Sequence, residues 1–600
     1  MCGIAGILDK NYLEKNSNDS LILSLMKTRG PDHSGLFKEL NNKLCVKLYH
    51  SRLTIIDDNI RSNQPFKYKN YILTYNGEIY NFKTIRNKLK EYGYSFQTKS
   101  DTEVVIKAFD KWGINSFDKF DGMWALSIYN TVKKELILSR DFFGEKPLFY
   151  YKQYNKFIFG SEIKYILSLG ENLPDIKKVN EDQVSLYLKQ GYRFLNKKNN
   201  TFYKNIFTLN PGFYLKINAN DGKIHINRYG KEKKYNKIIN ISEQDAIEET
   251  KRLVIESVKS RLISDFPVGF YLSGAIDSGS LTSIASKILN QEVKCYSIID
   301  KDIRYDESKN IDIIKKDINC KVKKIKFPQK HNFLEKLNEL INYHDSPIST
   351  LSYYTHSFIQ SHVKKDNIKV LISGAGGDEV FSGYFDHYLM HLREIKENLK
   401  KTTHLNNWKK FILPHVRNPN LKNIDLFKNS KNRNYLNSEL KKSFRKKFLV
   451  NASIKKFKEK NYSKSLLKNR MLNEIFHESV PVLCHEDDLN SMKNSIENRS
   501  PFLNKKILDF TMSLPSHMFI NILHDNVRLD RKKMGFNSSI NSLVDVKSDE
   551  LRNFLMNKQN IKDFIKINEL CKYLKKTKTI NNNESKFIFN VINLAIFLEK

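Results

Sequence analysis

The 600-residue chain contains few residues of the kinds that cross-link a fold or interrupt its secondary structure. It has 6 cysteines, 13 prolines and 23 glycines. The cysteines stand at positions 2, 45, 295, 320, 484 and 571, and no CxxC pair or Cys/His cluster has metal-ligand spacing. We therefore expect neither a disulfide framework nor a structural zinc site.

Long apolar runs are also missing. No stretch of about eighteen apolar residues occurs, so the sequence predicts no membrane span. The N-terminus lacks the basic stretch and long apolar stretch of a signal peptide, so we expect a cytoplasmic protein. A chain of this length exceeds one hydrophobic core, and two or more domains are expected. The 40% share of hydrophobic residues is ample for them.

Acidic residues are outnumbered, 66 to 102, which gives a formal net charge of +36. Such a charge suggests nucleic acid as a partner. The excess is spread along the chain as lysine among many Asn and Ile residues, which is the mixture that an AT-rich coding sequence gives. The densest basic stretch, 428–448, is typical of solvated helix faces. We favour a solvated surface and expect no specific nucleic-acid partner.

Short β-branched and aromatic runs dominate residues 1–215. Segments 71–82, 123–130, 135–141 and 156–162 are typical of strands, and 101–113 has helical spacing. This pattern predicts a mixed domain whose strands follow one another in antiparallel fashion. The polar, turn-rich sequence that follows predicts a linker over 216–242.

From residue 243 the pattern changes to alternating helices and strands. Segment 241–262 is an amphipathic helix, 267–273 a short strand, 280–289 a helix, and 367–373 a strand that ends in a Gly-rich loop. Alternation of this kind predicts a doubly wound parallel sheet with added helices over 243–600. Ligands in such sheets bind at the carboxyl ends of the strands.

The N-terminal sequence MCGIAGIL places a cysteine directly behind the initiator methionine. Once Met1 is removed, Cys2 would carry both a thiol and a free α-amine with a pKa of about 7.7–8.0. Nucleophile and base would then lie in one residue. A cysteine in this position can equally be a small buried apolar residue.

Further motifs follow in order: RGPD (29–32), HSRLTIID (50–57), NGEIYN (76–81), SDTEVV (100–105), FDGMWAL (120–126), RDFFGEKPLFY (140–150) and FGSEIK (159–164). Together with CGIAG they resemble the glutaminase domain of class II glutamine amidotransferases, and most closely the asparagine synthetase branch. The resemblance covers nearly all of 1–165. It implies a four-layer α/β/β/α domain in which Cys2 is the N-terminal nucleophile.

The resemblance also implies roles for five other residues. Arg52 would clamp the α-carboxylate of glutamine through its planar fork. Asp101 would take the ammonium group, and Glu78 would be another substrate contact. Asn76 and the backbone N–H of Gly77 would stabilise the oxyanion of the tetrahedral intermediate.

The segment YLSGAIDSGS (271–280) combines a strand, a turn of small residues and the start of a helix. Such a turn directs backbone N–H groups and hydroxyls at an anion. It is not the GxxxxGK[ST] loop. It resembles the SGGxDS loop of ATP pyrophosphatases, which split ATP between its α and β phosphates and form an acyl-adenylate. Ser273, Gly274, Asp277 and Ser278 match this loop.

Four further blocks match the same family in order: YDES (305–308), SGAGGDEVFSGY (373–384), SIENRSPFL (495–503) and RKKMGF (531–536). By this resemblance Ser373 and Gly374 contact phosphate, and Lys533 contacts phosphate or the adenylate and stabilises charge as pyrophosphate leaves. Asp277 and Asp378 would share Mg²⁺ with the pyrophosphate, because oxygen ligands suit that ion.

Three departures from the family pattern affect this second half. Ala275 replaces a loop glycine, and would be strained if its position required a positive φ. Ala375 stands where asparagine synthetases usually carry Glu. The segment 514–536 is short and lacks a K-x-x-L-R motif.

We therefore expect ATP-dependent, glutamine-hydrolysing amidation of a small carboxylate, with aspartate as the leading acceptor and asparagine as the product. Ammonia would pass between the two sites inside the protein, and a homodimer is compatible with the resemblance. Two alternatives remain within this reading. The acceptor could be another carboxylate, such as a sugar acid in surface-glycan synthesis. The chain could also be an impaired homologue that only hydrolyses glutamine or acts as a regulatory partner.

Overall fold

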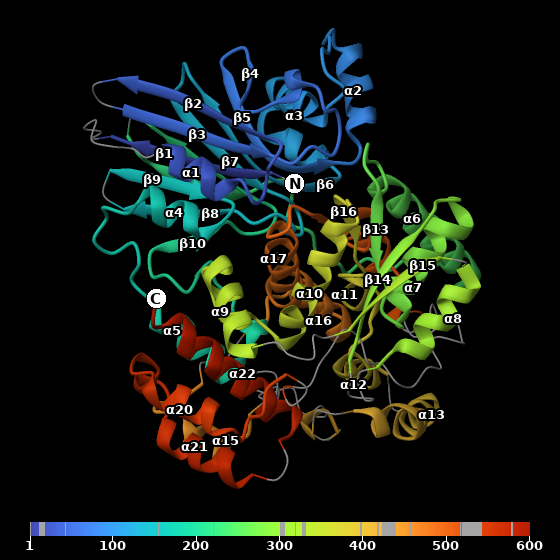
Figure 1. The fold of residues 1–600 in the computed structure, drawn as a ribbon. Coiled ribbons are helices and arrows are strands. Elements are labelled where there is room, and N and C mark those ends of the chain that lie inside the picture. The colour runs from blue at the N-terminus through green and yellow to red at the C-terminus, as the bar shows by residue number, and fades with distance from the viewer. Residues whose placement is uncertain are drawn as a thin grey trace.

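The computed structural model (Figure 1) describes residues 2–10, 19–41, 44–153, 155–219, 221–300, 306–318, 320–326, 332–395, 399–416, 419–422, 440–454, 458–516, 518, 540, 543–577 and 580–600. All statements below concern these residues.

Two antiparallel sheets form the first domain. The first sheet has the strand order β10-β8-β9-β1-β3-β2. Its strands are β1 (Gly3–Asp9), β2 (His33–Asn41), β3 (Leu44–Arg52), β8 (Phe149–Gln153), β9 (Lys156–Gly160) and β10 (Ile206–Thr208). The second sheet has the order β12-β11-β7-β6-β5-β4. Its strands are β4 (Phe66–Tyr68), β5 (Tyr71–Ile79), β6 (Gly122–Asn130), β7 (Glu135–Arg140), β11 (Phe213–Asn218) and β12 (Ile224–Arg228).

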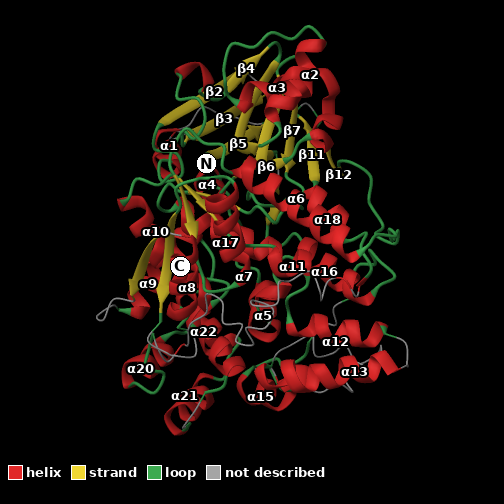
Figure 2. Cartoon of the chain, turned by 90° about the vertical axis from the view of Figure 1, so that its right-hand side faces the viewer, coloured by secondary structure: helices red, strands yellow, loops and turns green. Residues whose placement is uncertain are grey.

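The sheets pack face to face, and helices cover their outer sides. A buried cluster that includes Ile4, Val46, Leu138 and Leu215 fills the space between the sheets. Helices α1 (Asp19–Met26) and α4 (Ile163–Leu169) cover the first sheet, and α2 (Phe82–Glu91) and α3 (Asp101–Trp112) cover the second. The predicted α/β/β/α layering is confirmed (Figures 1 and 2).

The predicted linker over 216–242 differs from the structure in its first half. The end of β11 and all of β12 pair in the second sheet, with Ile217 opposite Ile224. Strand β12 lies at the sheet edge and three of its residues, His225 to Asn227, are exposed. It is short and is flanked by polar, turn-rich sequence, which is typical of a loop, and the predicted boundary at 215/216 cuts through β11.

The second domain contains the predicted parallel sheet. Its order is β15-β14-β13-β16-β17, and each pair is parallel. The strands are β13 (Val268–Tyr271), β14 (Lys294–Ile299), β15 (Lys321–Lys326), β16 (Val370–Ile372) and β17 (Glu497–Arg499). The chain moves outward from β13 to β15 and then crosses to β16 on the other side of β13. The point where the order reverses, between β13 and β16, is where open α/β sheets bind ligands.

Helices cover both faces of this sheet. One face packs against helices α6 (Glu243–Arg261), α7 (Ile276–Ser283), α8 (Ser308–Ile318), α16 (Leu466–His477) and α18 (Lys505–Thr511). The other packs against α10 (Leu351–Lys365) through Tyr271, Tyr296 and Leu371. The helix predicted over 280–289 begins earlier, as α7, and ends in one π-helical turn, Ile284–Ile288.

Further helices connect and enclose these layers. They are α5 (Glu181–Gln190), α9 (Phe333–His344), α11 (Gly377–Phe381), α12 (Phe385–Glu394), α13 (Leu399–Asn407), α15 (Lys442–Phe448), α17 (Ser479–Met492), α20 (Asp549–Asn557), α21 (Ile567–Lys576) and α22 (Asn582–Phe597). Helix α17 runs beneath the first domain (Figure 1).

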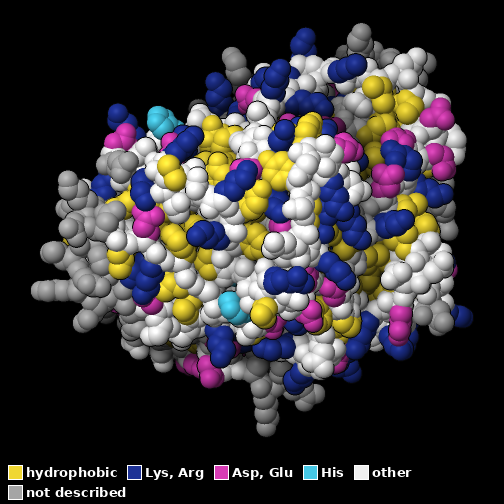
Figure 3. All heavy atoms as spheres, turned by 90° about the horizontal axis from the view of Figure 1, so that it is seen from above, with side chains coloured by type: hydrophobic (Ala, Val, Ile, Leu, Met, Phe, Trp, Pro, Cys, Tyr) yellow, Lys and Arg dark blue, Asp and Glu magenta, His cyan; other side chains and the backbone are white. Residues whose placement is uncertain are grey.

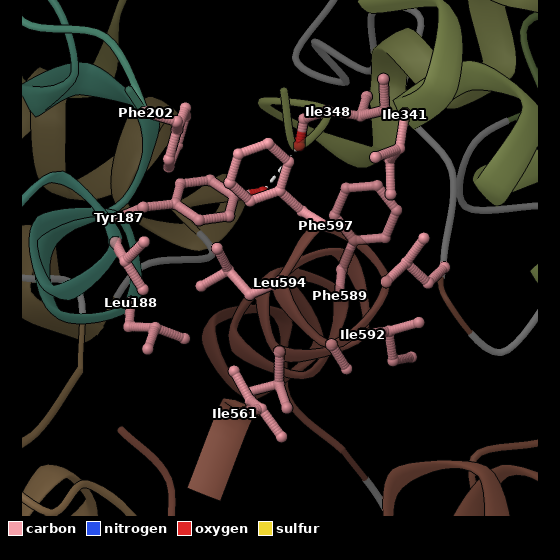
Figure 4. Close-up of a cluster of buried hydrophobic side chains, with 14 of the residues drawn as sticks. Tyr187, Leu188, Phe202, Ile341, Ile348, Ile561, Phe589, Ile592, Leu594 and Phe597 are labelled. Carbon is pink, nitrogen blue, oxygen red and sulfur yellow. Dashed lines mark hydrogen bonds between the residues drawn. The ribbon is translucent and has the colours of Figure 1, made fainter. Parts of the chain in front are cut away.

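The C-terminal helix α22 packs against residues of the first half of the chain. Phe597 makes edge contacts with Phe202 and Tyr203. Tyr187 of α5 donates its hydroxyl hydrogen to the carbonyl oxygen of Ile348 at 2.6 Å, beside Leu594 and Phe589 (Figure 4). This core joins α22 to residues much earlier in the sequence, so α22 contributes to the stability of the region around α5.

No helix within the described residues is long and apolar enough to cross a membrane. Figure 3 shows Lys and Arg side chains dispersed over the upper face, with Asp and Glu among them.

Candidate functional site

Cys2 lies at the start of β1, where the two sheets meet the second domain. Its backbone N–H donates to Asn76 Oδ1 at 3.0 Å. Asn76 is fully buried on β5, and its Nδ2 has no hydrogen-bond partner among the described residues. A buried donor without a partner is costly, and such donors mark places where a ligand completes the bonding. The side chain can therefore orient the Cys2 nitrogen and still donate to an oxyanion.

Gly77 follows on β5, where the backbone of β6 approaches closely. A Cβ at this position would lie 2.1 Å from the carbonyl oxygen of Met123. Only glycine fits this approach. The predicted oxyanion pair, Asn76 and Gly77, thus lies on the tightly packed strand β5, where Asn76 accepts a hydrogen bond from Cys2.

Asp101 is brought to the same place by the start of α3. Ser100 caps this helix by accepting from the N–H of Thr102 at 3.1 Å, as N-cap serines do. The Asp101 carboxylate accepts from the Tyr75 hydroxyl at 2.8 Å and from the Ile79 N–H at 3.0 Å. Burial raises the pKa of Asp101, and these two bonds oppose the rise.

Glu78 is only 7% exposed and lies near Asp101. Its pKa is raised well above the usual range, first by burial and then by the negative charges of Asp101 and Glu497. An ammonium group entering between Glu78 and Asp101 would relieve this repulsion. The pair therefore has the carboxyl oxygens and the burial that a site for an α-ammonium group needs, and a bound ammonium group would favour the ionised form of Glu78.

Arg52 ends β3, and its guanidinium contacts the loop over 56–63. It donates to the carbonyl oxygen of Asn59 at 3.1 Å, to Asn63 Oδ1 at 2.7 Å and to the carbonyl oxygen of Asp57. The predicted role as a carboxylate clamp remains a proposal, since these loop oxygens hold the guanidinium in this structure.

Burial is the main influence on the thiol of Cys2 and raises its pKa, while the Leu53 N–H and the charge of Arg52 oppose the rise. A thiol with a raised pKa is mostly protonated at neutral pH. Nucleophilic attack by Cys2 therefore requires a nearby base to take the proton.

In the second domain, the turn after β13 is closed by hydroxyl groups. Ser273 Oγ and Ser278 Oγ lie 2.8 Å apart, and the Ser273 N–H donates to Ser278 Oγ at 3.0 Å. Ala275 has φ −93° and ψ 163°, which is ordinary extended backbone. The condition for strain at Ala275, a positive φ, is not met, because this position precedes the helix in a conformation that any residue adopts.

The two Gly-rich turns lie against each other. A Cβ built on Gly377 would lie 2.6 Å from Asp277 Oδ1, and one on Gly374 would lie 3.0 Å from the Cβ of Asp277. Glycines thus create the space that the Asp277 carboxylate occupies. Asp378 is the residue after Gly377, at the start of α11, so both carboxylates lie where β13 and β16 end. Half-buried oxygen donors on adjacent turns fit a hard cation such as Mg²⁺.

Two other predicted blocks adjoin these turns. A Cβ on Gly274 would lie 2.7 Å from the Cβ of Asn310 and 3.0 Å from that of Glu307, next to the YDES block. Asn498 Nδ2 and Ser500 Oγ lie 3.3 Å and 3.4 Å from Ser373 Oγ. Lys533 and most of the segment 514–536 lie outside the described residues.

A different acidic cluster, Asp386, His387 and Glu474, has metal-ligand spacing. Arg470 binds Asp386 at 3.3 Å and Glu474 at 2.9 Å, and His387 Nε2 lies 2.7 Å from Glu474. These basic groups already neutralise the carboxylates. Burial lowers the pKa of His387, but the charge and the hydrogen bond of Glu474 outweigh it, so the pKa is raised. The cluster is a buried ion-pair network.

The sequence motifs contained three residues whose part in the site was not predicted, namely Arg29, Glu497 and Arg499. Arg29 of RGPD donates to the Cys2 carbonyl oxygen at 3.1 Å and to Asp488 of α17 at 2.7 Å. Glu497 and Arg499 of the SIENRSPFL block are fully buried near Glu78. The motifs identified these residues, but only the packing of the two domains shows what they contact.

A two-sheet domain that begins beside Cys2, joined to a parallel-sheet domain with two adjoining Gly-rich turns, is the arrangement expected of a two-domain amidotransferase. Family comparison gives the same division. A glutamine amidotransferase domain model matches residues 1–230, and an asparagine synthase model matches residues 249–565. The chain belongs to the glutamine-hydrolysing asparagine synthetase family.

Curated relatives agree with this membership. "Putative asparagine synthetase 2 (glutamine-hydrolyzing)" of Methanocaldococcus jannaschii is 31% identical over 405 residues, which cover 64% of this chain and 76% of that protein. Glutamine-hydrolyzing asparagine synthetase 3 of Bacillus subtilis is 28% identical over 555 residues, covering 88% of this chain and 82% of that protein. A solved structure of the allosteric regulatory enzyme of purine biosynthesis matches 55% of this chain and 82% of its own, with 15% identity and a TM-score of 0.29.

Proposed function

We propose that the chain uses glutamine and ATP to convert a small carboxylate into its amide, releasing glutamate, AMP and pyrophosphate. The observation that carries this proposal is the arrangement at Cys2. Asn76 Oδ1 holds the Cys2 nitrogen, while Asn76 Nδ2 is buried and unpaired among the described residues. This is the geometry that an oxyanion requires next to a nucleophile.

In the glutamine half, Cys2 Sγ attacks the side-chain amide carbon of glutamine, and the thiol proton passes to the α-amine exposed by removal of Met1. Asn76 Nδ2 and the Gly77 N–H donate to the resulting oxyanion. The C–N bond then breaks, and the departing nitrogen takes the proton and leaves as ammonia. Water hydrolyses the thioester to glutamate and restores the thiol. Asp101 and Glu78 hold the ammonium group of the substrate.

In the ATP half, a carboxylate oxygen attacks the α-phosphorus and the bond to the β-phosphate oxygen breaks. Backbone N–H groups and hydroxyls of Ser273, Ser278 and Ser373 bind the leaving pyrophosphate. Asp277 and Asp378 would hold Mg²⁺, which neutralises charge on the phosphates when bound. Ammonia attacks the acyl carbon and AMP leaves, giving the amide.

We also propose that ammonia crosses between the sites within the protein. Arg29 supports this, because one guanidinium contacts both the Cys2 carbonyl oxygen and Asp488 of the second domain. Its side chain is fully buried. The nucleophile therefore lies directly at the junction, on the side of the first domain that faces α17.

Aspartate is the proposed acceptor, because the curated relatives are named asparagine synthetases. The identities of 28–31% leave room for another carboxylate, such as a sugar acid. The test supplies glutamine, ATP and Mg²⁺ with a panel of carboxylates and measures glutamate, AMP, pyrophosphate and the amide. Equal amounts of AMP and amide with one acceptor are expected. The proposal fails if no carboxylate gives AMP, either with glutamine or with ammonium salts in its place.

A second candidate is an enzyme that only hydrolyses glutamine. Ala375 favours it, because a methyl group stands where asparagine synthetases usually carry a Glu side chain. In the same experiment this candidate gives glutamate and ammonia with every acceptor, and no AMP.

A further inference from the structure

Strand β17 of the second domain brings a rigid arginine to the edge of the first domain. Arg499 Nη1 donates to the carbonyl oxygens of Arg261 at 2.6 Å and Ile263 at 2.7 Å, and Nε donates to Glu497 at 2.6 Å. The side chain is fully buried. These three bonds leave little freedom for the guanidinium to move.

The remaining nitrogen of Arg499 is directed across the domain junction. Nη2 lies 3.8 Å from Glu78 Oε1 and has no hydrogen-bond partner among the described residues. A buried guanidinium nitrogen in this state favours a carboxylate beside it. Glu78 is thus the residue of the predicted glutamine site that Arg499 faces.

The charges around Glu78 explain why it needs a cation. The charged side chains that act on it are Asp101 of α3 and Glu497 and Arg499 of β17. Burial and the two acidic neighbours raise the pKa of Glu78 well above its usual range, and the charge of Arg499 opposes that rise. A neutral acid would attract an ammonium group weakly, whereas a carboxylate would attract it strongly.

We propose that Arg499 is a positioning residue of the glutamine site, which holds Glu78 as a second carboxylate, beside Asp101, for the α-ammonium group of glutamine. This rests on the proposed function. The second domain then completes a substrate site that belongs by sequence to the first.

The same strand also reaches the phosphate turns. Asn498 and Ser500 flank Arg499 and contact Ser373 Oγ at 3.3 Å and 3.4 Å. Arg499 is therefore one residue away from side chains that adjoin the second Gly-rich turn. Both substrate sites share the backbone of β17.

Two competitive inhibitors separate this role from a purely structural one. L-Glutamate carries the α-ammonium group, and glutarate is the same diacid without it. Inhibition constants for both are measured against glutamine hydrolysis by the full chain and by Arg499→Gln. We expect the preference for glutamate over glutarate to fall about tenfold in Arg499→Gln, because one charged contact to the ammonium is lost. Glutarate should bind nearly unchanged.

Arg261→Gln is the matched control. Arg261 is another buried arginine at the junction, but its acidic partner is Asp121 at 3.3 Å. We expect the preference for glutamate to stay at the wild-type value in this variant. In a Glu78→Gln background, Arg499→Gln should cause no further loss of preference.

If glutamate and glutarate both bind Arg499→Gln more weakly by the same factor, the proposal is overturned, since that result indicates general damage to the site. If Arg499→Gln does not fold, the preference for glutamate over glutarate is measured with Arg499→Lys instead. A lysine cannot bind both carbonyl oxygens and face Glu78, so the preference should fall partway, and an unchanged preference would overturn the proposal equally. Absence of glutamine hydrolysis in the unaltered chain would instead contradict the proposed function itself.

Discussion

The two half-sites differ in how far their side chains are fixed before a substrate arrives. In the first domain Asn76, Glu78 and Asp101 are each less than a tenth exposed and lie on or beside tightly paired strands. In the second, Asp277 and Asp378 are half-buried at the ends of strands. A small neutral amide can be hydrolysed in a closed, preorganised pocket, whereas a triphosphate needs an open end of a sheet. The following experiments test that difference.

The largest effect is expected from Cys2→Ala. Glutamine hydrolysis should fall by about 10⁴-fold or more, because the nucleophile and its thioester are lost. Synthesis supported by ammonium salts should be unchanged, since the second site is chemically separate. Both rates are measured as glutamate and AMP formation, and mass spectrometry should find Met1 removed. Full glutaminase activity in the variant would rule out Cys2 as the nucleophile.

The carboxylates of the second site should matter only to the ATP reaction. Asp277→Asn and Asp378→Asn are each expected to lower acceptor-dependent ATP–pyrophosphate exchange about 10³-fold, because loss of a metal ligand costs several kcal/mol in the transition state. Glutamine hydrolysis should be spared. Asp366→Asn is the control, because Asp366 pairs with Lys323 at 3.0 Å and precedes β16 rather than following it. Undiminished exchange in both variants would mean that the ATP site lies elsewhere.

Asn76→Ala tests whether the first site is preorganised. Removal of one oxyanion donor should lower kcat for glutamine about 10²–10³-fold with a small change in KM. A large rise in KM with kcat little changed would indicate that Asn76 binds the ground state instead. Thermal unfolding of the variant checks that the fold is retained.

The smallest effect is expected at Ala275. Because its backbone is extended, Ala275→Gly should change synthetase turnover by less than about twofold. Gly376→Ala is the contrasting variant, since Gly376 has φ +90° and a Cβ there would lie 2.4 Å from Leu503 Cδ2. That strain should destabilise the chain by about 1–3 kcal/mol, measured by denaturant unfolding. A large gain in turnover from Ala275→Gly would show that its methyl group obstructs the phosphates.

Local patterns predicted the elements that hold the site. The β-branched and aromatic run in 71–82 predicted β5, and the helical spacing of 101–113 predicted α3, with Asp101 at its start. The edge strand β12 could not be recognised, because its alternation of Ile224 and Ile226 is short and lies within polar, turn-rich sequence. The contact between Arg499 and Glu78 could not be predicted either. This contact depends on how the two domains pack, and a local hydrophobic pattern in the sequence carries no information about that packing.

The conformation of Ala275 shows the same limit on a smaller scale. A family pattern with glycine at a position suggests a positive φ, but glycine also occurs where space is short or by chance. The backbone angle in this chain distinguishes these reasons.

The packing of α22 against α5 has a consequence for truncated variants. Residues 582–597 supply one side of the core that surrounds Tyr187, Phe202 and Ile348. A variant that stops before residue 582 would keep the whole two-sheet domain and still expose the apolar surface around α5, including Phe202 and Tyr203, to water. The region around α5 therefore depends on a helix that lies far from it in the sequence.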